Sequence, residues 1–112
     1  MRMLWYSGLY TGKKADLHRA DVIRQIRDGK SLPWVYVVTP ASNRENILDI
    51  YRADDLKNPA YRGREFLILG VADGYQEALE VAAGIVGELY EKTGDFRLER
   101  LIPGAKTESR RC

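Results

Sequence analysis

The chain has 112 residues, of which 45% are hydrophobic and 30% are charged. This length and balance predict one soluble globular domain, and they exclude a disordered chain and a second core. The apolar runs are far shorter than the ~20 residues that cross a bilayer, so we expect no membrane partner. A single cysteine, Cys112, excludes a disulfide framework, and a single histidine excludes a His-rich metal site.

Charge is distributed unevenly along the chain. Residues 1–30 hold seven Lys/Arg against three Asp, whereas residues 61–90 hold two Lys/Arg against five Asp/Glu. Such asymmetry favours an anionic partner near the basic N-terminal part, or self-association of oppositely charged patches. Because Arg2 is followed at once by a strand-like run, we expect no signal peptide and a cytoplasmic protein.

The first half of the chain predicts a strand, a helix and two further strands. Residues 3–10 are aromatic-rich and read as a strand. A helix follows at residues 16–28, with Asp16 as its N-cap and Gly29 at its end. After it we expect strands at residues 34–38 and 47–52 and a loop at residues 53–64.

The second half predicts a buried strand, a long helix and a last strand. Residues 66–71 form a continuous apolar run, which suits a central strand buried on both faces. A helix then follows, with Asp73 as its N-cap, Gln76 as the capping-box partner and Gly94 after its last turn, and residues 96–102 form the last strand. Helical spacing predicts one broad apolar face on this helix, formed by Tyr75, Ala78, Leu79, Ala82, Ile85, Val86, Leu89 and Tyr90. The opposite, solvent-facing side is predicted to carry Glu77, Glu80, Gly84, Gly87, Glu88 and Glu91.

The predicted order of elements is β-α-β-β-β-α-β. This order is typical of a ferredoxin-like two-layer α+β sandwich, with a mainly antiparallel sheet and both helices on one face. An open three-layer α/β sheet is the alternative. We expect one globular domain over residues 1–103, followed by a polar, disordered tail at residues 104–112.

Three segments carry a resemblance to other proteins: Trp-Tyr-Ser-Gly-Leu-Tyr-Thr-Gly-Lys-Lys at residues 5–14, Asn-Ile-Leu-Asp-Ile-Tyr at residues 46–51, and Glu-Ala-Leu-Glu at residues 77–80. With them the chain resembles a family of small uncharacterised bacterial proteins of about this length. The resemblance spans nearly the whole chain and implies a single intact domain. It implies no activity.

The turn between the first strand and the first helix is the first candidate site. Gly8, Gly12 and Lys13 are similar to a phosphate loop, but the glycine spacing is one residue short and Lys14 replaces the Mg²⁺-binding hydroxyl. A general anion site remains, because cations gather where a helix presents free N–H groups and its positive dipole end. The alternative is a solvated loop beside a snorkelling arginine. The predicted anion site consists of Gly12, Lys13, Lys14, His18 and Arg19.

Aromatic residues on three predicted strands are the second candidate. If strand alternation brings them to one uncovered sheet face, they form a platform of the kind that stacks bases in RNA-binding and single-strand-binding domains. The same residues suit core packing or a dimer interface. We favour these two interpretations over nucleic-acid binding, because no RNP-like string is present. They are Tyr6, Tyr10, Trp34, Tyr36 and Tyr51.

The sequence offers no convincing catalytic or metal centre. Asp54 and Asp55 are adjacent in a loop, so we expect their carboxylates to point apart. His18 is the single histidine, and no serine lies in a nucleophile-elbow pattern. Cys112 is at the chain end, where no surroundings can lower the pKa of its thiol. We therefore expect a non-catalytic binding domain without a cofactor. It would form a homo-oligomer, with a dimer favoured, and bind a phosphate-type anion. A nucleic-acid-binding module is the alternative, and an enzyme of unrecognised type is a remote one.

Overall fold

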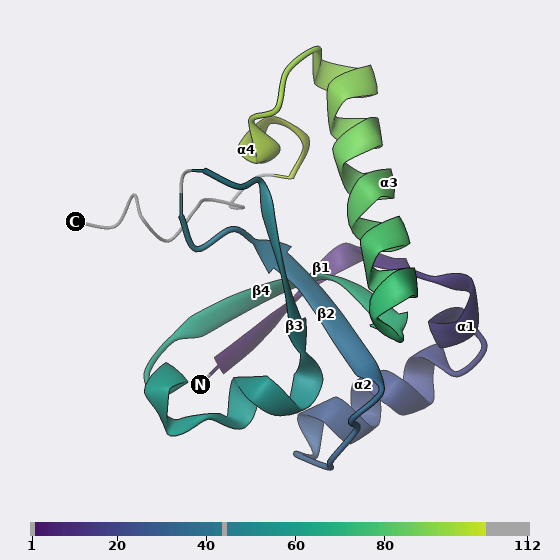
Figure 1. Cartoon of the computed structure of the whole chain (residues 1–112), viewed down its shortest axis with the longest axis vertical. Coiled ribbons are helices and arrows are strands. Elements are labelled where there is room, and N and C mark those ends of the chain that lie inside the picture. The colour runs from purple at the N-terminus through teal and green to yellow at the C-terminus, as the bar shows by residue number, and fades with distance from the viewer. Residues whose placement is uncertain (1, 44, 103–112) are drawn as a thin grey trace.

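A four-stranded mixed sheet carries the other elements of the chain (Figure 1). The computed structural model describes residues 2–43 and 45–102. The strands are β1 (Arg2–Thr11), β2 (Val35–Pro40), β3 (Leu48–Arg52) and β4 (Glu65–Asp73). Their order across the sheet is β1-β4-β2-β3. β1 is parallel to β4, whereas β2 is antiparallel to both β4 and β3, so the expected predominance of antiparallel pairing is confirmed.

The central strands β4 and β2 are apolar on both sides. Ile68 and Val37 belong to one buried cluster, and their neighbours Leu69 and Val38 belong to another. Successive strand residues point to opposite faces, so each face of the sheet has its own core. The prediction that residues 66–71 form a strand buried on both faces is confirmed.

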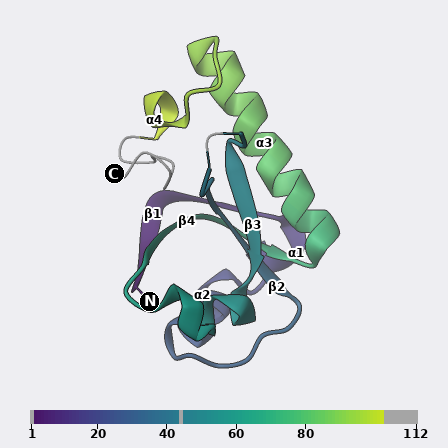
Figure 2. The ribbon, with the colours of Figure 1, turned by 60° about the vertical axis from the view of Figure 1, so that its left-hand side comes forward.

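Helices cover both faces of this sheet (Figures 1 and 2). Val22 of α2 (Arg19–Arg27) and Leu56 of the 3₁₀ helix η1 (Ala53–Lys57) pack with Val37. Leu89 of α3 (Tyr75–Thr93) packs with Val38 on the other side. The prediction of both helices on one face is therefore wrong. The physical reason is β4 itself, because a strand that is apolar on both sides needs cover on both.

The predicted helix at residues 16–28 begins earlier and is divided in two. α1 (Lys13–Asp16) starts after Gly12, which takes the N-cap position predicted for Asp16. α2 starts after His18, and Leu17 in the break is 79% exposed. The turn at this break directs the buried residues of both helices into one core. The end at Gly29 is confirmed, since this residue has the left-handed φ of +73° that favours glycine.

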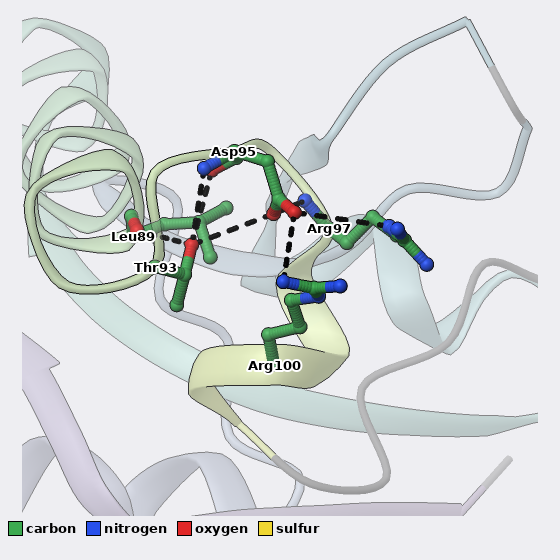
Figure 3. Close-up of polar contacts among 5 residues, drawn as sticks. All are labelled: Leu89, Thr93, Asp95, Arg97 and Arg100. Atoms are coloured by element: carbon green, nitrogen blue, oxygen red, sulfur yellow. Dashed lines mark hydrogen bonds and ion pairs between the residues drawn. The ribbon is translucent and has the colours of Figure 1, made fainter.

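The segment predicted as the last strand contains a short helix, α4 (Leu98–Leu101) (Figure 3). Asp95 sets its start: a carboxylate oxygen accepts the Arg97 N–H at 3.0 Å, and the carboxylate forms an ion pair with Arg100 at 3.2 Å. Leu98 and Ile102, four residues apart, are both buried against the α3 cluster. The prediction of a strand over residues 96–102 is therefore wrong, because the apolar contacts of this segment are made at helical spacing.

The α+β class is confirmed, whereas the ferredoxin-like order is not. Among the described residues no fifth strand follows α3, and α4 lies where that order places one. The predicted tail at residues 104–112, with Cys112, lies outside the described residues. In the part of the chain that the structure covers, none of the helices has the length and apolar character needed to span a bilayer.

Leu89 provides a test of the α3 packing. It is fully buried between α3 and the sheet, so Leu89→Ala should lower the free energy of unfolding by about 2–5 kcal/mol. Glu91→Ala, an exposed position on the same helix, should leave it within about 0.5 kcal/mol. Urea unfolding of the two variants measures both values, and equal losses would contradict the assigned faces.

Candidate functional site

The residues of the predicted anion site lie together at the start of α1 and at its junction with α2. Lys13, Lys14, His18 and Arg19 are exposed, and Gly12 is buried. The Arg19 guanidinium donates a hydrogen bond to the Leu9 carbonyl at 3.5 Å and lies 4.0 Å from the Asp16 carboxylate. Arg19 therefore contacts β1 and α1 of its own chain.

The backbone donors of this turn are bonded to a side chain of the protein itself. The carboxylate of Glu77, in the first turn of α3, accepts the N–H of Lys14 at 2.8 Å and that of Ala15 at 3.1 Å. It also accepts the N–H of Asp73, at the end of β4, at 2.9 Å. One carboxylate therefore joins α1, β4 and α3.

Glu77 is almost completely buried, with 6% of its surface exposed, so its predicted place on the solvent-facing side of the helix is wrong. Burial by itself would raise the pKa of Glu77, but the backbone N–H donors of Asp73, Lys14 and Ala15 outweigh it and hold the pKa below its usual value. Gly12 is required beside it, because a Cβ there would overlap the Glu77 carboxyl group.

Sequence reasoning missed this role of Glu77, although a signal was present. Gly74, with a φ of +91°, is the N-cap of α3, which makes Glu77 the third helical residue. A glutamate at this position reaches back to a backbone N–H in a capping box. The expected cap, Asp73, instead contributes its N–H to Glu77. Binding of an external anion by Lys13, Lys14 and Arg19 stays a prediction, now without two of the N–H donors that favoured it.

The five aromatic residues of the second candidate site do not share one face. Tyr6 and Tyr10 stack on each other, and Tyr36 contacts Tyr75 of α3, on the α3 side of the sheet. Tyr51 lies on the opposite side, in contact with two other rings, those of Tyr61 and Phe66. Trp34 precedes β2 and is half exposed. Because helices cover both faces of the sheet, the condition of one open aromatic platform is not met.

Tyr10 is tied to α3 through Glu88. Its hydroxyl donates a hydrogen bond to the Glu88 carboxylate, which also forms an ion pair with Lys92 at 3.0 Å. Desolvation by burial and the neighbouring Glu88 charge raise the pKa of Tyr10, so the phenol stays protonated at neutral pH. This tyrosine therefore anchors β1 to α3.

The broad apolar face predicted for α3 is only half used by the core. Ala78, Ile85 and Leu89 are buried against the sheet, as predicted for that face. The other half remains uncovered: Tyr75 is 54% exposed, Leu79 40% and Tyr90 55%. We call this side of α3 the outer stripe. It consists of the exposed residues Tyr75, Leu79, Ala83 and Tyr90 and the half-buried residues Ala82 and Val86.

The outer stripe forms one continuous surface without charge. At 100° per residue its members fall within a sector of about 100°, beside the buried sector. Phe96, also half exposed, extends it by stacking on Tyr90 at a centroid distance of 5.1 Å. Figures 1 and 2 both show α3 at the margin of the molecule, with the sheet and α4 to one side of it. Glu80 and Glu91 lie beyond the other edge of the stripe.

Comparisons of the chain with family models, with curated proteins and with solved structures found no match. The family resemblance of the sequence therefore stays a prediction. In the described part of the chain, no three side chains of His, Cys, Asp or Glu gather as a metal site would require. The site that the geometry presents most clearly is the outer stripe.

The Glu77 carboxylate predicts a specific pH dependence. Glu77→Gln weakens three hydrogen bonds to an ionised acceptor, one buried and two partly buried, and should lower the free energy of unfolding at pH 7 by about 1–3 kcal/mol. Because the folded pKa of Glu77 is lowered, its contribution is complete above the unfolded value, near 4.3, and is lost as the pH falls through the folded value.

Urea unfolding of both proteins between pH 7 and pH 3 measures this dependence. The difference between the natural chain and Glu77→Gln should shrink on acidification. Glu80→Gln, an exposed carboxylate one turn along the helix, should show no comparable difference at either pH. A difference for Glu77→Gln that is independent of pH would contradict the assigned role of its charge.

Proposed function

We propose that this chain is a non-catalytic interaction domain that self-associates through the outer stripe of α3. The observation that carries the proposal is the apolar surface of α3 that the fold leaves uncovered. Contiguous apolar surface of this kind is typical of interaction sites, whereas scattered exposed apolar residues are ordinary. Tyr75, Tyr90 and Phe96 are also of the residue types that are enriched at interfaces.

The exposed area fits an association of modest strength. An aromatic side chain buries ~150–250 Å² when it is fully covered, so each half-exposed ring offers roughly 100 Å². The three rings together with Leu79 offer roughly 300–400 Å² per copy. Ala82, Ala83 and Val86 add further apolar area. The total per copy then approaches the roughly 500 Å² that each partner buries in the smallest specific interfaces.

The competing functions have less support from the arrangement of side chains. In the part of the chain that the structure describes, the ring of His18 is exposed and makes no hydrogen bond to a serine or a carboxylate. Nucleic-acid stacking requires several rings on one accessible face, and the predicted rings belong to separate groups. Self-association remains the function that uses a surface the fold actually exposes.

Sedimentation equilibrium over a range of concentrations tests the proposal. The apparent mass should rise from 12.8 kDa toward twice that value. Leu79→Lys places a charge in the stripe and should return the mass to that of one chain. Gly84→Lys adds the same charge on the opposite side of α3, where a Cβ meets open space, and should leave the association intact.

Salt distinguishes this function from its alternative. Added salt should preserve or strengthen the apolar association, whereas nucleic-acid binding weakens steeply as salt increases. A mass of one chain at every concentration would contradict self-association. A mass of two chains in both lysine variants would place the interface on another surface.

A further inference from the structure

We infer that two copies pack their α3 helices antiparallel, about a two-fold axis that passes between Ala82 and Ala83. This inference rests on the proposed self-association and adds the arrangement of the two chains. A two-fold interface requires a surface that complements itself, so that a residue contacts a given partner residue and is contacted in return. The spacing of the outer stripe meets this requirement in the antiparallel direction.

The stripe is symmetric in residue size about its centre. In an antiparallel pair centred between Ala82 and Ala83, each of these two residues lies beside its own counterpart at the axis, Leu79 opposes Val86 of the second copy, and Tyr75 opposes Tyr90. Small residues thus meet at the crossing point, aliphatic residues meet one turn away, and aromatic residues meet at the ends. Small side chains at the centre permit the short interaxial distance, ~8 Å, at which the larger ones interlock.

Aromatic clusters at the two ends of α3 complement each other in this arrangement. At one end Tyr90 stacks on Phe96, and at the other Tyr75 contacts Tyr36 at a centroid distance of 5.6 Å. The antiparallel pair brings the first cluster of one copy against the second cluster of the other. The two-fold axis produces this contact twice, so most of the exposed aromatic area becomes covered.

The helix dipoles also favour the antiparallel direction over the parallel one. Two antiparallel helices place the positive end of each dipole beside the negative end of the other, whereas two parallel helices place like ends together. This contribution is small.

Cysteine cross-linking tests the arrangement in a Cys112→Ser background. A disulfide needs Cβ atoms within about 4.5 Å, so only opposed positions can form one. The double variant Leu79→Cys with Val86→Cys should convert to covalent dimer on mild oxidation, because each cysteine opposes the other position of the second copy. Within one chain these positions are about 10 Å apart along the helix and cannot pair.

The single variants separate the possible arrangements. Leu79→Cys alone should stay at the background level of covalent dimer, since its counterpart is two turns away in an antiparallel pair. Ala83→Cys lies next to the axis and should cross-link by itself, which is the positive control. Efficient cross-linking of Leu79→Cys alone would show a parallel pair and overturn the inference.

Light scattering on the same reduced samples separates the two levels of failure. A chain that is dimeric before oxidation, but in which neither the double variant nor Ala83→Cys cross-links, associates through another surface, and the antiparallel arrangement is then wrong. A monomeric natural chain overturns the proposed self-association itself. A dimeric chain with cross-links in the double variant and in Ala83→Cys, but not in Leu79→Cys alone, supports both.

Discussion

The arrangement of α1, β4 and α3 depends on the hydrogen bonds that the buried carboxylate of Glu77 accepts. This carboxylate accepts hydrogen bonds from backbone donors of α1 and of the end of β4, and Glu77 itself belongs to the first turn of α3. A buried carboxylate is costly unless donors surround it, and unpaired N–H groups at helix starts are costly without an acceptor. Each of these groups therefore removes the penalty of the other, and Gly12 leaves the space in which they meet.

These hydrogen bonds to Glu77 occupy backbone donors of the basic turn that follows β1. Lysines beside free N–H groups would form an anion site, but here the N–H groups of Lys14 and Ala15 already bind an anion that belongs to the chain. The lysines at this corner then add surface charge around an occupied cap. Within residues 2–43 and 45–102, the apolar side of α3 that faces away from Glu77 is left partly exposed.

A sheet with two apolar faces explains how α3 comes to expose that surface. α2 and η1 cover one face, and α3 and α4 cover the other. α3 contacts the sheet through the sector around Ile85, and α4 packs near its C-terminal end. The sector around Leu79 and Val86 faces away from both. A helix with an apolar sector wider than its contact with the sheet can serve the core and an interface together.

The sequence by itself determined the α+β class, the strands β1 to β4, the long helix and its end at Gly94, because these follow from local periodicity and turn chemistry. The tertiary structure decided the rest. Local periodicity predicts a solvent-facing Glu77, but the contact with α1 buries its carboxylate. It also fails to predict the short helix within residues 96–102, which depends on the packing of Leu98 and Ile102 against α3. The part of the α3 apolar face that is buried is also decided by how the helix packs on the sheet. Contacts between residues distant in sequence decide these points, and local patterns do not contain them.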